Sequence, residues 1–130
     1  MATQQASAAI FAENLRRLME HSKLSQAELG RKAKVAQTML SGLLSRDEGV
    51  KNPTSSTIDK LCGYFKVPPW KMLMPGIAIE LLLDHGLETV VEAYAQSSKT
   101  GQDTILRISQ VEARYEKMNA SSTSKTGTSG

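Results

Sequence analysis

Residues 25–44 read SQAELGRKAKVAQTMLSGLL, and the spacing within this stretch sets the architecture around it. Ser25 followed by Glu28 forms an S-x-x-E capping box, which predicts that a short helix begins there. A second short helix is predicted over about 37–45. Because only three or four residues join the two helices, they must cross at a steep angle to share a core. The crossing needs a small residue on the first helix, which Gly30 supplies. The apolar side chains expected at the crossing are Val35, Leu40 and Leu43.

Helical periodicity continues on both sides of this stretch. Apolar spacing predicts a helix over about 8–21 and another that carries Ile58, Leu61, Cys62 and Phe65. Ser55 or Ser56 is expected to cap the latter. Pro69 can open a short fifth helix, WKML, in which Trp70 is expected to anchor the core. The prediction is an all-α protein, with a five-helix domain over 8–76 and a short C-terminal helical extension.

The remaining segments follow other patterns. Residues 77–95 predict one helix broken at Gly86 or two short helices, and residues 103–118 predict a final helix. Residues 1–7 and 119–130 lack apolar periodicity, and the second of these is rich in Ser, Thr and Gly, so both are expected to be disordered. The extension is therefore expected over 77–118.

Composition argues against several classes of protein. One cysteine among 130 residues excludes an internal disulfide, and no metal-ligand spacing occurs. The longest nearly apolar run, 77–83, is too short to span a bilayer, and the N-terminus lacks the basic region of a secretory signal. We therefore expect a cytoplasmic protein. Paired carboxylates, a nucleophile–base pair and a glycine-rich phosphate loop are all missing, so no enzyme, cofactor, metal or small-molecule ligand is expected.

The charges are unevenly divided along the chain. Residues 8–75 hold 11 Lys and Arg against 6 Asp and Glu, a net charge of +5. Residues 76–118 hold 4 against 7, a net charge of −3. A basic half beside an acidic half indicates a polyanion as the partner of the basic half.

Two short helices that cross steeply form a helix-turn-helix, whose second helix can place its N-terminal residues in the DNA major groove. The sequence resembles the Cro and phage-repressor family, with the lambda-repressor-like fold, over about residues 8–75. The matching pieces are FAENLRRLMEHSKLSQAEL, then KVAQTMLSGLL, then NPTSSTIDKLCGYFKVPPWKML. The resemblance implies a nucleoid-associated, sequence-specific transcription regulator, most often a repressor, whose partner is double-stranded DNA.

The resemblance also assigns roles by position. Gln26 opens the second helix, where the family contacts a phosphate and sometimes a base edge. Gln37 is the best base reader, since its amide can pair bidentately with adenine. The outward face at the start of the recognition helix is Ala36, Gln37, Thr38 and Ser41. The loop residues that hold the DNA backbone are Arg46, Lys51 and Asn52. The surrounding basic footprint is Arg17, Lys23, Arg31, Lys32 and Lys34.

Three features depart from the family pattern. Lys34 stands in the turn where relatives often have Gly, and a left-handed conformation there costs on the order of 1 kcal/mol. Gly42 stands where relatives often carry a long polar base contact. The loop after the third helix is longer than in the shortest relatives. We therefore expect few direct contacts to base edges, with DNA shape or loop contacts contributing to specificity.

The final helix carries a broad apolar face that an isolated helix of this length would leave in water. Its members are Ile105, Leu106, Ile108, Val111 and Tyr115. Since the basic domain can close its own core, we expect a second copy to cover this face, giving a two-fold homodimer on two half-sites. The alternative is an antitoxin-like or antirepressor-like adaptor, whose C-terminal helices bind another protein.

Overall fold

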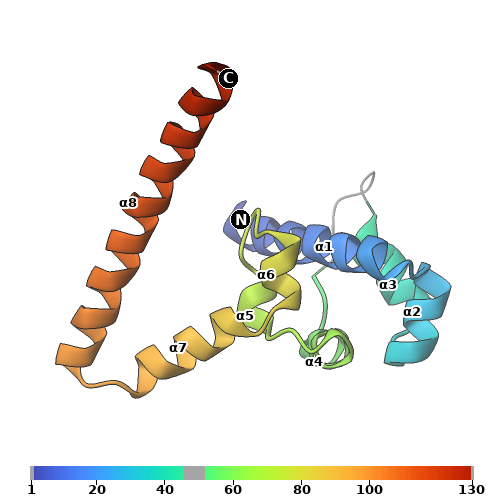
Figure 1. Cartoon of the computed structure of the whole chain (residues 1–130). Helices are drawn as coiled ribbons and strands as arrows, with labels where there is room; N and C mark the ends of the chain where they lie inside the picture. The colour runs from blue at the N-terminus through green and yellow to red at the C-terminus, as the bar shows by residue number, and fades with distance from the viewer. Residues whose placement is uncertain (1, 46–51, 130) are drawn as a thin grey trace. The chain divides into compact units, whose positions relative to one another are not determined.

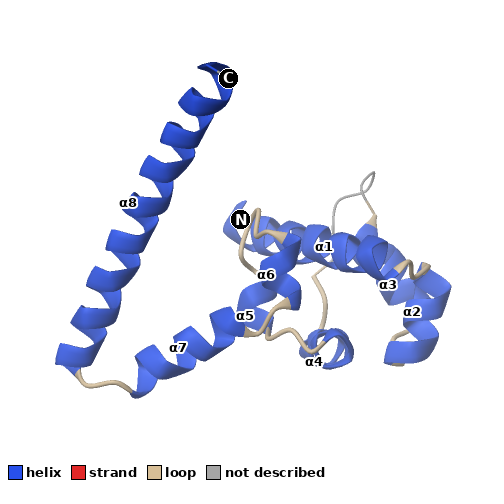
Figure 2. Cartoon of the chain, viewed as in Figure 1, coloured by secondary structure: helices blue, strands red, loops and turns tan. Residues whose placement is uncertain are grey.

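The computed structural model describes residues 2–45 and 52–129, with side chains described over 7–45 and 52–120. This part of the chain holds helices and loops and no strand, which confirms the predicted all-α class (Figure 2). Of these helices, none is both long and apolar enough to cross a membrane. In chain order (Figure 1) the helices are α1 (Ala2–Ser22), α2 (Gln26–Ala33), α3 (Gln37–Leu44), α4 (Ser55–Phe65), α5 (Pro69–Met72), α6 (Ile79–Leu83), α7 (Gly86–Gln96) and α8 (Lys99–Ser129).

The chain divides into two compact units, Met1–His85 and Gly86–Gly130. The first contains α1 to α6, and the second contains α7 and α8. The division falls at His85 and not at Gly76, where the sequence placed it. Ile77 and Leu82 are buried in the first unit, and α6 packs against α1. The apolar run after Gly76 therefore completes the core of the first unit and is not part of the extension.

The core of the first unit is made of side chains with almost no exposed surface. They come from all six helices: Phe11, Leu15, Leu18, Leu29, Leu40, Leu43, Leu61, Met72 and Leu82. Burial of apolar surface on this scale is the main favourable term in folding, at roughly 25 cal/mol per Å² removed from water. The core packs α1, α2 and α3 together, so the inner face of α3 is fixed against α1 and α2.

The prediction that Trp70 anchors the core is wrong. Trp70 is 39% exposed, whereas the next two residues, Lys71 and Met72, are buried. In a helix each residue turns by about 100°, so the burial of Met72 points Trp70 away from the core. The buried Lys71 ammonium donates a hydrogen bond to the Asp84 carbonyl oxygen at 2.5 Å, which ties α5 to the end of α6.

Helix α4 begins one or two residues earlier than predicted. Its N-cap is Thr54, whose hydroxyl accepts a hydrogen bond from the Thr57 backbone N–H at 3.1 Å, so the prediction of Ser55 or Ser56 is wrong. Thr57 is buried, which holds its N–H close to the cap. Ser is usually preferred over Thr as an N-cap residue, which is why the sequence favoured the two serines over Thr54.

The terminal helices are longer than the sequence indicates. Helix α1 begins at Ala2 and α8 ends at Ser129, so helix extends into segments 1–7 and 119–130 that were expected to be disordered. Neither segment contains a proline, which would stop a helix from continuing outward from its neighbours. The predicted final helix, 103–118, lies wholly inside α8.

Gly30 marks the closest approach of α2 to the turn that follows it. A Cβ atom on Gly30 would lie 2.9 Å from the Val35 carbonyl oxygen and 3.4 Å from Leu40 Cδ1. The first distance is shorter than real Cβ atoms tolerate, and the atom it meets is backbone, which cannot rotate away. The sequence-based expectation of a small residue at the crossing is therefore confirmed.

We expect Gly30→Ala to destabilise the protein by about 1–3 kcal/mol, because the new methyl group overpacks against the Val35 carbonyl. Gly63→Ala is the matched control. Gly63 lies in α4 with nothing within 4 Å of an added Cβ, so the same change should stabilise by about 0.5–1 kcal/mol through helix propensity. Urea denaturation of both variants measures the free energies of unfolding. Equal effects would show that α2 and the turn are not in close contact.

Candidate nucleic-acid interface

Helix α3 presents one polar face to solvent and locks the other into the core. Leu40, Leu43 and Leu44 are buried. The residues of the predicted reading face are all exposed: Ala36, Gln37, Thr38 and Ser41. No side chain caps α3, so its first N–H groups are left for water or for an anion such as a phosphate. This face is therefore held rigidly and is open to a ligand.

Gln26, at the start of α2, lies against the same face. The Ser41 hydroxyl donates a hydrogen bond to Gln26 Oε1 at 3.2 Å. This bond orients the amide and leaves the Gln26 Nε2 group as the donor for an outside acceptor. The structure thus joins two predicted contact residues that stand 15 positions apart in the sequence. Gln26 is half-buried in the process, while Ser41 stays exposed.

The start of α2 is fixed by the predicted capping box. The Glu28 N–H donates to the Ser25 hydroxyl at 3.1 Å, and the Ser25 N–H donates to Glu28 Oε1 at 3.3 Å. The Ser25 backbone bond, and then its hydroxyl bond, lower the pKa of the Glu28 carboxyl. Because the pKa of Glu28 is lowered in the folded state, the hydrogen bonds of the capping box stabilise the fold near neutral pH. This stabilisation is lost as the pH falls through the folded-state pKa. The box holds Gln26 at the first turn.

The two neighbouring arginines of α1 have separate tasks. Arg16 donates to the Glu13 carboxylate at 2.9 Å and to the Leu44 carbonyl oxygen at 3.0 Å, which satisfies the C-terminal end of α3. The sequence did not single it out. Arg17 donates to Asn14 Oδ1 and to the Ile77 carbonyl oxygen, inside the first unit. Arg17 was expected in the DNA-binding footprint, but its guanidinium is engaged in holding the chain after α5.

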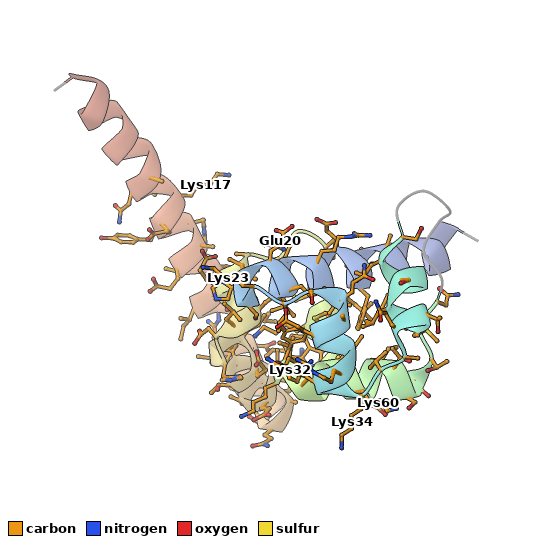
Figure 3. The ribbon with its side chains drawn as sticks, turned by 90° about the vertical axis from the view of Figure 1, so that its right-hand side faces the viewer. Glu20, Lys23, Lys32, Lys34, Lys60 and Lys117 are labelled. Carbon is orange, nitrogen blue, oxygen red and sulfur yellow. The ribbon has the colours of Figure 1, made fainter. Side chains whose placement is uncertain are left out.

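The other members of the basic footprint are accessible: Lys23, Arg31, Lys32 and Lys34 are exposed. Figure 3 shows the Lys34 side chain pointing away from the ribbon. Lys23 follows α1, and with Arg16 and Gln26 it lines a hollow of about 300 Å³. Asn52, expected as a loop contact, is exposed, whereas Arg46 and Lys51 lie outside the described residues.

Lys34 ends α2 in the left-handed conformation, with φ 61° and ψ 45°. Its N–H is directed at the Gly30 carbonyl oxygen, and the Val35 N–H donates to the same oxygen at 3.0 Å. Glycine is the residue that adopts this conformation without steric cost. The turn between α2 and α3 therefore holds a strained lysine, as its place in the sequence suggested.

Lys34→Gly should stabilise the protein by about 1 kcal/mol, since it removes the left-handed strain. Lys32→Gly makes the same substitution at an exposed position inside α2, where it should destabilise by about 1 kcal/mol. Thermal melts of the two variants should therefore shift in opposite directions. A destabilised Lys34→Gly variant would contradict the left-handed cap.

Comparison with known proteins agrees with this geometry. The family described as helix-turn-helix matches residues 15–69, which run from within α1 to the first residue of α5. No curated protein and no solved structure matches the chain. The matched range includes the capping box, the Gly30 crossing and the whole of α3. Residues 15–69 therefore match a helix-turn-helix domain, similar to those of the Cro and phage-repressor type, and this match supports a DNA-binding transcription regulator.

Proposed function

We propose that the chain is a sequence-specific repressor of the phage or prokaryotic type, which binds a two-half-site operator as a homodimer. The observation that carries this proposal is the open face of α3. Its polar residues are exposed while its opposite side is fixed in the core. A recognition helix needs both properties, because its side chains must reach base edges from a backbone that does not move.

Gln37 is the proposed base reader. It is the first residue of α3 and is exposed, and no intramolecular hydrogen bond orients its amide elsewhere among the described residues. A glutamine amide can donate to N7 and accept from N6 of adenine at the same time. Thr38 beside it offers a methyl group to thymine or a hydroxyl to a phosphate. Gly42 has no side chain, so fewer residues of α3 can contact base edges.

The proposed phosphate contacts surround α3 on two sides. Gln26 has its amide oriented by Ser41, and Lys23 lies on the same hollow. Lys34 extends from the turn in front of α3 (Figure 3). Phosphate contacts supply sequence-independent affinity and fix the register of the helix in the groove. The proposal leaves out Arg17, whose guanidinium holds the Ile77 carbonyl.

The second unit supports the dimer. Helix α7 has no buried residue, and α8 leaves large apolar side chains in solvent. An isolated helix pair with so little burial has little to stabilise it, whereas a second copy would remove that surface from water. The adaptor function predicts instead that a different protein covers α8. Its signature would be a chain that stays monomeric alone.

Gln37→Ala should lower affinity for the operator by about 1–3 kcal/mol and leave affinity for unrelated DNA unchanged. Lys34→Gly is the contrasting variant: it should weaken binding to every duplex and flatten the salt dependence, although it stabilises the fold. The operator comes from sequencing DNA crosslinked to the protein, and fluorescence anisotropy gives the affinities. Unchanged discrimination in Gln37→Ala would place the reading face elsewhere.

Ile108→Asp should convert the dimer to monomer and weaken operator binding, because it places a charge in the apolar interface. Ser109→Asp adds the same charge to the neighbouring position, away from that face, and should leave the dimer intact. Sedimentation equilibrium at micromolar concentration measures the assembly. A monomeric parent chain that still binds its operator would remove the dimer from the proposal and keep the DNA-binding function.

A further inference from the structure

Helix α8 carries an uncovered apolar stripe with coiled-coil spacing. Ile108, Val111, Tyr115 and Met118 are 57%, 54%, 61% and 71% exposed. Their separations alternate between three and four residues, the spacing of a and d positions in a heptad repeat. Thr104 stands one such step before Ile108 and opens the stripe. A stripe at this spacing stays on one side of a supercoiled helix and meets an identical stripe on a second helix.

The neighbouring helix α7 leaves this stripe uncovered. The Gln102 amide donates to the Tyr94 carbonyl oxygen at 2.9 Å, and Gly101, Gln102 and Ile105 are half-buried where the two helices meet. At about 100° per residue, Gln102 lies roughly 120° around α8 from Ile108. Leu106 lies still farther around, so of the five residues expected to form the dimer face it is the one that cannot share the stripe.

The charges beside the stripe distinguish the two possible orientations of a second helix. Arg107 occupies a g position and Glu112 the e position five residues later. In a parallel, in-register pair, Arg107 of each copy faces Glu112 of the other, and opposite charges attract. In an antiparallel pair, g positions face g positions, so Arg107 would meet Arg114, a second arginine. The charge pattern therefore favours the parallel arrangement.

Both charges are available for such a pair. Glu112 has Ile108, Ser109, Tyr115 and Glu116 at the positions three and four residues away, none of which is basic. Asp103, the acidic neighbour of Arg107 on the helix, pairs with Lys99 at 3.3 Å. Among the described residues neither Arg107 nor Glu112 belongs to an ion pair.

We propose that α8 associates with α8 of a second copy as a parallel, in-register, two-stranded coiled coil, flanked by two Arg107–Glu112 pairs. The inference rests on the proposed dimer and adds its orientation and register. Parallel pairing brings the two Lys99 ends together, so both helix-turn-helix domains emerge from the same end of the coiled coil. This arrangement is compatible with a two-half-site operator, on which both recognition helices reach one face of the duplex.

Charge reversal at the flanking positions tests the orientation in the full-length chain. Arg107→Glu should weaken dimerisation roughly tenfold at low salt, because two symmetric attractions become repulsions. Glu112→Arg should do the same, and the double variant should recover the parent affinity. An antiparallel pair predicts the opposite for Arg107→Glu, which would gain Arg114 as a partner and dimerise more tightly. Sedimentation equilibrium separates these results.

Disulfide trapping tests the register. Tyr115→Cys places two thiols opposite each other at an a position and should give a covalent dimer under mild oxidation. Leu106→Cys, on the far side of α8, should not. Cys62 is buried, and desolvation raises the pKa of its thiol to about 11, so it stays protonated and does not compete.

Tighter association of Arg107→Glu, crosslinking of Leu106→Cys in place of Tyr115→Cys, or a parent chain that is monomeric throughout would each overturn the coiled coil. Operator binding is measured on the same samples. A monomeric chain that discriminates its operator refutes this inference and leaves the proposed DNA-binding function standing. A chain that passes both coiled-coil tests but shows no preference among duplexes refutes the proposed function and leaves the coiled coil standing.

Discussion

The close approach at Gly30 is the constraint on which the recognition geometry depends. The Val35 carbonyl oxygen occupies the space where any other residue at position 30 would place its Cβ atom, 2.9 Å away. The chain can turn this tightly only because Lys34 adopts a left-handed conformation. The direction of α3, and therefore of Gln37, follows from that turn. A turn with no spare space allows one crossing angle, so the reading face is preorganised before any DNA arrives.

Directional bonds from α1 then hold the rest of the first unit around that turn. Apolar packing is roughly proportional to area and does not by itself choose one arrangement of short helices. Asn14 donates to the Met72 and Met74 carbonyl oxygens at 2.8 and 3.1 Å, and Arg16 donates to the Leu44 carbonyl oxygen. These bonds satisfy backbone groups at helix ends that would otherwise lack partners. One helix thereby positions both the recognition helix and the chain after α5.

The two units differ in how much of their surface they can bury. The first has a closed core to which all six of its helices contribute, with Leu82 as the contribution of α6. The second has no buried side chain in α7 and a largely exposed α8. Most of its apolar side chains are therefore left in contact with solvent. The second unit carries five Lys and Arg against five Asp and Glu, so it has no net charge with which to attract DNA phosphates.

The sequence by itself determined the features that arise within one helical turn: the capping box at Ser25, the left-handed strain at Lys34, the small residue at Gly30 and the periodicity of each helix. Only the tertiary structure decided that Arg16 holds α3, that the Arg17 guanidinium is bonded to the Ile77 carbonyl, and that Trp70 faces solvent. The roles of the two arginines rest on bonds between residues 28 and 60 positions apart. Neighbouring arginines have the same chemistry, so their roles depend on which distant carbonyl the fold brings within reach.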